Sequence, residues 1–168
     1  IMIESIDHKT RDVLENKPFS RFEGEILGLD KHLDFSSLDF AHPFVWISSI
    51  ASGDFNNDGW QDIVLGDRQG ILLYKNLEES TFILQETNIP KIKDLNVIIT
   101  AFVDIDNDGW QDIYVTSYGG RNYFIMNDKK GFQNPKVLEA PNEGVEATLA
   151  VSFGDLNKDG YLDFINGN

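Results

Sequence analysis

The amino-acid sequence predicts an all-β protein made of repeated four-stranded antiparallel sheets. Two observations carry this prediction. An acidic motif recurs three times, beginning at Asp54, Asp104 and Asp155, so the copies are separated by 50 and 51 residues. Short runs of aromatic and branched residues lie between the copies, and turn residues such as Gly70 and Gly119 separate these runs. A near-constant period of this length is typical of arrays, solenoids and propellers.

Each period is expected to hold about four strands. One apolar segment precedes each motif, a second follows it directly, and two more lie farther along the chain. These later segments are residues 70–76 and 80–87 in the first period, and 121–128 and 131–140 in the second. Asn76 and Asn127 occupy equivalent places in the two periods. Four short strands in roughly 40–50 residues is the size of one propeller blade, so we predict β-propeller blades built as antiparallel meanders.

The first 45 residues do not follow this period. Residues 4–17 have helix-favouring composition, but Ile6, Val13 and Leu14 form only a thin apolar stripe, which predicts at most a short helix. The rest of this part is expected to be irregular. The predicted organisation is a lead-in segment, residues 1–45, and a repeat region of about two and a half blades, residues 46–168, with motifs at 54–62, 104–112 and 155–163.

Composition limits the functional classes. The chain has 168 residues, of which 41% are hydrophobic, and a formal net charge of −14. Such an acidic chain is not expected to bind nucleic acid or anionic membranes, which require basic surface. It has no cysteine, which excludes disulfides and thiolate chemistry, and no apolar run close to the ~20 residues of a membrane span. Because position 1 is not Met, we expect a processed or partial chain.

The repeated motif has the form Asp-x-(Asn/Asp)-x-Asp-Gly-aromatic-x-Asp, whose residues we number as positions 1 to 9. When the backbone coils around a point, positions 1, 3 and 5 turn their oxygens inward, and glycine at position 6 permits the sharp turn. Position 7 would add a backbone carbonyl and position 9 a last carboxylate. Ca²⁺ takes roughly 6–8 oxygen ligands, whereas Mg²⁺ keeps several waters and Zn²⁺ prefers His or Cys. We therefore predict Ca²⁺ in these loops, about three ions in all.

Two alternatives compete with this interpretation. A hairpin rich in Asp, Asn and Gly can use its side chains only to cap backbone groups, but three copies in register favour metal ligands. An EF-hand would carry a bidentate Glu at position 12, where this chain has Leu65, Val115 and Asn166. The flanking segments are also short and branched. The loop is therefore expected to join two strands rather than two helices.

At these motifs the chain resembles the FG-GAP/VCBS repeats of integrin α-subunit-type β-propellers. The forms DFNNDGWQDI and DIDNDGWQDIY are particularly similar to repeats of proteins related to cartilage acidic protein. The resemblance covers about residues 46–168 and implies blades around a central axis, with Ca²⁺ in the loop between the first two strands of each blade. Such propellers usually have about seven blades. The remaining blades are thus expected from the same longer chain or from another subunit.

The resemblance also implies which residues would hold the ions, by their position in the motif. Positions 1, 3, 5 and 9 would ligate through side chains and position 7 through its carbonyl. The implied ligands are Asp54, Asn56, Asp58, Trp60 and Asp62 in the first loop, Asp104, Asp106, Asp108, Trp110 and Asp112 in the second, and Asp155, Asn157, Asp159, Tyr161 and Asp163 in the third. The aromatic side chains at position 7 either form a repeated contact surface or pack over a neighbouring strand, and we favour packing.

Catalysis finds little support in the sequence. The three histidines, His8, His32 and His42, lie near no recurring acid or nucleophile, and no glycine-rich phosphate loop is present. We therefore expect a non-enzymatic, calcium-stabilised module for adhesion, recognition or assembly, with a protein or carbohydrate partner. Its expected location is extracellular, periplasmic or at the cell surface, where Ca²⁺ is abundant. Two alternatives are a structural subunit of a surface complex and a propeller attached to a secreted carbohydrate- or lipid-active enzyme.

Overall fold

The computed structural model describes residues 49–67, 70–78, 81–91, 96–141 and 147–167, together with Leu27 and Leu29. Of the expected lead-in segment, residues 1–45, only Leu27 and Leu29 are described. The short helix expected within residues 4–17 lies outside the described residues. The described ranges contain ten strands. They are β1 (Ser49–Gly53), β2 (Asp62–Asp67), β3 (Gly70–Asn76), β4 (Phe82–Leu84), β5 (Val97–Val103), β6 (Asp112–Ser117), β7 (Tyr123–Met126), β8 (Lys136–Glu139), β9 (Ala150–Gly154) and β10 (Asp163–Gly167).

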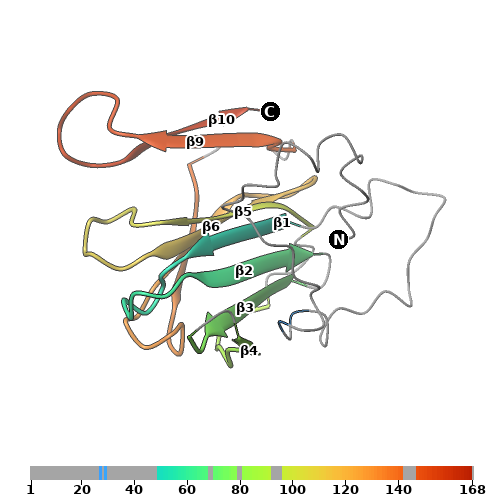
Figure 1. Ribbon diagram of the computed structural model, residues 1–168. Coiled ribbons are helices and arrows are strands. Elements are labelled where there is room, and N and C mark those ends of the chain that lie inside the picture. The colour runs from blue at the N-terminus through green and yellow to red at the C-terminus, as the bar shows by residue number, and fades with distance from the viewer. Residues whose placement is uncertain are drawn as a thin grey trace, which may run out of the picture.

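These strands form three antiparallel sheets that follow one another along the chain (Figure 1). Two are four-stranded meanders, β1-β2-β3-β4 and β5-β6-β7-β8, and the third is the hairpin of β9 and β10. We call them blade 1, blade 2 and hairpin 3. The predicted β-propeller blades are confirmed, because both complete sheets are all-antiparallel meanders of the expected size.

Each acidic motif forms the loop between the first two strands of its sheet, and the register is the same in all three copies. The residue before the motif pairs with the Asp at its ninth position, in the pairs Gly53–Asp62, Val103–Asp112 and Gly154–Asp163. The three loops therefore project at the same side of the stacked sheets (Figure 1). The twelfth motif residue lies within a strand, which agrees with the expected strand-to-strand loop.

The first hydrophobic core lies between blades 1 and 2. Phe55, Val64 and Leu73 of blade 1 pack in one cluster with Val115 and Ile125 of blade 2. Gly66 in β2 permits the two sheets to approach closely. A Cβ atom at this glycine would contact Val97 and would lie 2.7 Å from a methyl carbon of Thr100.

The second core, between blade 2 and hairpin 3, is centred on Tyr114. This fully buried ring packs at a centroid distance of 4.7 Å from Phe124 and meets Phe153 of hairpin 3 edge-on, at 5.5 Å and 87°. Its hydroxyl donates to Asn166 Oδ1 at 2.9 Å and accepts from Asn122 Nδ2 at 3.1 Å. Tyr114 therefore fixes hairpin 3 against blade 2 by both ring packing and hydrogen bonding.

Within the described part of the chain, no helix has the length and apolar character needed to cross a membrane.

Candidate metal centres

The Asp at position 1 organises each loop by accepting two backbone N–H groups from the same loop. In the first loop Asp54 Oδ1 accepts from Asp58 N at 3.1 Å, and Oδ2 accepts from Gly59 N at 2.8 Å. Asp104 and Asp155 make the same pairs of bonds in the second and third loops, at 2.9 to 3.1 Å. These local bonds coil the backbone around position 1, as the sequence predicted.

The backbone of each loop passes through the left-handed region at two places. Position 4 has φ of 57° at Asn57, 59° at Asn107 and 63° at Lys158. The glycine at position 6 has φ between 85° and 89° in all three copies, a conformation that a residue with a Cβ adopts only with strain. The expected sharp turn at the motif glycine is thus present in every loop.

The side-chain oxygens at positions 1, 3 and 5 of the second loop converge. Ligand oxygens of Asp104, Asp106 and Asp108 lie within 4.8 Å of one another, and these three residues could hold a metal ion. The first and third loops have Asn56 and Asn157 at the place of Asp106, so each has one carboxylate fewer. The donors are oxygen atoms only, which suits a hard cation such as Ca²⁺ and not Zn²⁺.

Asn56 provides a second test of whether a cation fits the first loop. Its Oδ1 accepts from Asp58 N, while its Nδ2 is buried without a hydrogen-bond partner among the described residues. A 180° rotation of the amide group would exchange its two atoms, so that Oδ1 would lie where Nδ2 now has no partner. A cation could bind Oδ1 there. Asp58 N would still be bonded to Asp54 Oδ1. The loop would therefore fit an oxygen-bound cation at the cost of the Asn56 bond, while Asp58 N keeps its bond to Asp54.

In the first two motifs, the Asp at position 9 lies at the base of the loop and joins the loop to the third strand of the sheet. Asp62 is fully buried, and its oxygens accept from Phe55 N at 3.2 Å and from Asn76 N of β3 at 2.8 Å. Asp112 repeats this arrangement with Ile105 N at 3.3 Å and Asn127 N at 2.7 Å. These side chains were predicted as ligands from the sequence. Their backbone bonds also give them a structural role.

Burial changes the acidity of these two carboxyl groups. It raises the pKa of Asp62 to about 6, with a smaller contribution from the charges of Asp58 and Asp54, although the hydrogen bonds from Asn76 and Phe55 oppose the rise. Burial likewise raises the pKa of Asp112 to about 6. A nearby cation would favour the ionised form of both groups.

Lysine side chains neutralise the position-5 carboxylates of the first two loops. Lys129 Nζ lies 2.9 Å from Asp108 Oδ2, and this contact lowers the pKa of Asp108. Lys75 Nζ lies 3.2 Å from Asp58 Oδ2. Burial by itself would raise the pKa of Asp58, but the hydrogen bonds from Trp60 N and Lys75 outweigh it and the pKa falls. Both lysines thus occupy places where they would compete with a cation held by these carboxylates.

The aromatic side chains at position 7 are more exposed than predicted. Trp60 is 40% exposed and Tyr161 is 60% exposed, whereas Trp110 is half-buried. The exposure of Trp60 and Tyr161 leaves part of each ring available for contact, and the favoured interpretation, packing over a neighbouring strand, stays a prediction.

Asn127 is a site residue whose role the sequence did not reveal. Its Nδ2 donates to Phe55 O in blade 1 at 2.8 Å and to Gln111 O in blade 2 at 2.9 Å. Asn76, its counterpart in blade 1, donates to Gln61 O at 3.1 Å. The signal was present in the sequence, because both asparagines occupy the same place in the repeat. The inter-blade bond could not be inferred from it.

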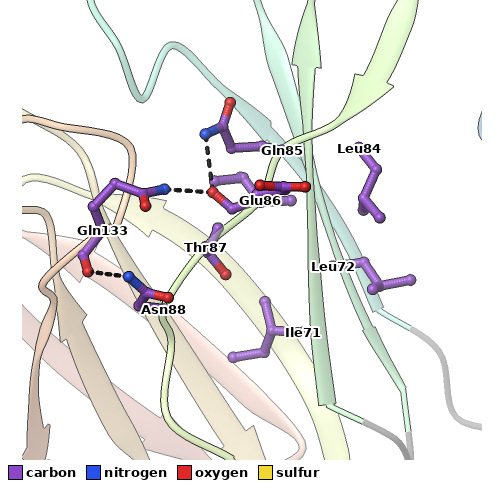
Figure 2. Close-up of a pocket in the computed structure, with 9 residues that line it drawn as sticks. Ile71, Leu72, Leu84, Gln85, Glu86, Thr87, Asn88 and Gln133 are labelled. Atoms are coloured by element: carbon purple, nitrogen blue, oxygen red, sulfur yellow. Dashed lines mark hydrogen bonds between the residues drawn. The ribbon is translucent and has the colours of Figure 1, made fainter.

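A groove of about 390 Å³ lies beside blade 1, and none of its lining residues belongs to an acidic motif (Figure 2). Its apolar wall includes Ile71 and Leu84. Its amides are bonded to the chain itself, since Gln85 and Gln133 both donate to Glu86 O, at 3.0 and 2.5 Å. The groove is therefore lined by residues of both blades.

A comparison with protein-family models finds the FG-GAP-like repeat twice, at residues 54–115 and 104–165. This chain belongs to the FG-GAP-like repeat family. Each FG-GAP match begins at the first Asp of one loop and ends shortly after the next loop, so the family unit extends across two neighbouring sheets. No curated protein matches the chain in a sequence comparison. The predicted membership is confirmed at this level, while the finer similarity to integrin and cartilage acidic protein repeats stays a prediction.

Proposed function

We propose that this FG-GAP-like chain is a calcium-binding module whose three loops each hold one Ca²⁺. The observation that carries the proposal is the cluster of Asp104, Asp106 and Asp108, with ligand oxygens within 4.8 Å of one another. The other two loops have the same register and the same hydrogen bonds at position 1. The proposed ligands are the residues at positions 1, 3, 5, 7 and 9 of each loop.

The proposed role of the ion is to stabilise the loops. Carboxylates held this close repel one another, and a bound divalent cation replaces that repulsion by attraction. Because the ion would bind the folded loop and not the unfolded chain, it would stabilise the fold by mass action. The chain's own contribution is the backbone coil, which holds the oxygens together before the ion arrives.

Calorimetric titration of the chelator-treated protein tests the proposal. We expect about three Ca²⁺ per chain, a melting temperature that millimolar Ca²⁺ raises by several degrees, and a much smaller effect of Mg²⁺. The variant Asp106→Ala should lose one equivalent. The control Asp128→Ala should keep all three, because Asp128 accepts backbone N–H groups in a turn outside the motifs. No bound metal together with an unchanged melting curve would contradict the proposal.

We further propose that the module acts outside the cell in adhesion or assembly, with a protein or carbohydrate partner and without catalysis. FG-GAP repeats typically occur in extracellular or surface proteins, which supports this location. The exposed rings of Trp60 and Tyr161 lie beside the proposed calcium sites. Exposed aromatic side chains next to ordered loops favour a contact surface.

Binding assays with one matched variant test this surface. A glycan array and a pull-down against surface proteins should detect a partner of the calcium-loaded protein. The double variant Trp60→Ser and Tyr161→Ser should lose that partner but keep its calcium stoichiometry. Retention of the partner by this variant would place the contact surface elsewhere. A stable complex in the pull-down with no signal on the array would favour the structural-subunit alternative.

A further inference from the structure

The side chain at position 4 of one loop reaches the next loop. Asn57 Nδ2 in the first loop donates to Gly109 O in the second at 2.9 Å, and Asn107 Nδ2 in the second donates to Gly160 O in the third at 2.6 Å. Both bonds join the same two motif positions, 4 and 6, in consecutive copies. They form a repeated link that connects all three loops at their tips.

Local geometry explains why these bonds run from position 4 to position 6. Asparagine tolerates the left-handed backbone that position 4 requires, and its short amide is fixed once that backbone is fixed. The acceptor glycine directly follows the proposed ligand at position 5, and its N–H group is bonded to the carboxylate at position 1. Each end of the link is therefore adjacent to proposed metal ligands.

A second connection joins the first two loops at their base. Asp62 accepts from Phe55 N, Phe55 O accepts from Asn127 Nδ2, and Asn127 N donates to Asp112. This chain of hydrogen bonds runs from position 9 of the first loop to position 9 of the second. Loops 1 and 2 are thus linked at both tip and base.

We propose that Asn57 and Asn107 couple the three calcium sites, so that filling one site raises the affinity of its neighbour. This inference rests on the proposed calcium function. Position 4 lies between the ligands at positions 3 and 5, so an ion that fixes those ligands also fixes the asparagine amide. The amide then holds the glycine of the next loop near its bound conformation. The second ion meets a loop that is already partly ordered, which gives positive cooperativity.

Thermodynamic linkage makes this coupling reciprocal, and that gives a direct test. The affinity of site 1 is measured with site 2 intact and with site 2 disabled by Asp106→Ala. The N–H signals of Gly59 and Gly109 in nuclear magnetic resonance spectra report the two loops separately, because both groups are bonded to position 1. Disabling site 2 is expected to weaken Ca²⁺ binding at site 1 by about fivefold or more.

The variant Asn57→Gly removes the linking amide and keeps the backbone freedom of position 4. In this variant, disabling site 2 should lower the Ca²⁺ affinity of site 1 by less than about twofold, because the tip link is removed and the proposal assigns no coupling to the base connection through Asn127. The control Lys158→Gly makes the same change in loop 3, where the described residues show no inter-loop bond from position 4. In Lys158→Gly, disabling site 2 should still weaken Ca²⁺ binding at site 1 as much as in the parent protein. Asn107→Gly should keep the coupling of sites 1 and 2 and remove that of sites 2 and 3.

Two outcomes are distinguished. If disabling site 2 lowers the Ca²⁺ affinity of site 1 equally in the parent protein and in Asn57→Gly, the coupling through Asn57 is wrong, whereas the proposed calcium binding stands. The absence of any calcium-induced shift at Gly59 and Gly109 would instead overturn the proposed function. Should Asn57→Gly fail to fold, the Asn107→Gly variant supplies the same test for sites 2 and 3.

Discussion

The side-chain amide of Asn127 donates a buried hydrogen bond of 2.8 Å to the carbonyl of Phe55, although 72 residues separate the two in the chain. The same amide bonds to Gln111 O, and the backbone N–H of Asn127 bonds to Asp112. One residue therefore ties the base of the first acidic loop to the base of the second.

Replacing Asn127 should destabilise the fold. We expect Asn127→Ala to lower the free energy of unfolding by about 2–3 kcal/mol, because it leaves buried carbonyl groups without a donor. The matched control is Asn76→Ala, whose amide donates to Gln61 O within its own blade. Urea denaturation measures both variants, and an equal loss in the two would show that the inter-blade bond contributes little.

Gly66 tests the close approach of blades 1 and 2. We expect Gly66→Ala to lower the free energy of unfolding by about 1–3 kcal/mol, because its Cβ would overlap Val97 and crowd Thr100. Gly154→Ala is the control, since no atom lies within 4 Å of the place its Cβ would occupy. Thermal unfolding compares them. A Gly66→Ala protein as stable as the parent would indicate that the sheets separate easily.

The lysines beside the loops should weaken cation binding. Lys129 is paired with Asp108 at 2.9 Å, so we expect Lys129→Met to raise the calcium affinity of the second site several-fold. The control Arg121→Met breaks an exposed ion pair with Glu139 outside the loops, and it should leave that affinity unchanged. Calorimetry at low and high salt separates the charge effect of Lys129 from other effects of the substitution, because salt screens exposed charges. Unchanged affinity in Lys129→Met would mean that the pair opens freely.

The number of carboxylates should rank the sites. The second loop carries Asp106 where the others carry asparagine, and Lys158 adds a positive charge within the third loop. Because ligand charge is one determinant of Ca²⁺ affinity, we expect the order second, first, third. Asp106→Asn should bring the second site towards the first, and Asn56→Asp should strengthen the first. If Asp106→Asn leaves the tightest binding step unchanged in calorimetry, carboxylate number does not set the order.

Without calcium, stability should fall as pH rises from about 4 to 6. The pKa of Asp62 and of Asp112 is raised to about 6 in the folded protein, above the value of about 3.9 expected for an unfolded chain. The folded state then binds more protons in this window, so its stability is complete below pH ~4 and is lost as pH rises through 6. In chelator we expect the free energy of unfolding to be about 1–3 kcal/mol larger at pH 5 than at pH 7.

The control for this pH dependence is the double variant Asp62→Asn and Asp112→Asn, which should flatten the curve. The carboxyl groups of Asp58 and Asp108 have lowered pKa values and change stability in the opposite direction, but only in more acidic solution. Saturating calcium should reverse the slope, because protons compete with the metal. A stability that increases from pH 5 to pH 7 in chelator would contradict this prediction.

Much of the fold and of the loop geometry was predictable because its causes are local. The three motif copies determine the coiled loops through bonds that span four or five residues, such as Gly59 N to Asp54. Glycine at position 6 indicates the turn, and alternating apolar runs indicate the strands. The equivalence of Asn76 and Asn127 also followed from the repeat, and the FG-GAP match confirms the family.

The tertiary structure decided the features that join residues from different blades. The sequence predicted Asp62 as a ligand, but its full burial and its bond to Asn76 N depend on how β3 pairs with β2. The link from Asn57 to Gly109 exists only because the two sheets stack with their loops on one side. Exposure of Tyr161 likewise depends on which strands lie beside hairpin 3. Local sequence determines each hairpin, whereas contacts across 50 or more residues depend on sheet twist and core packing, which no single motif encodes.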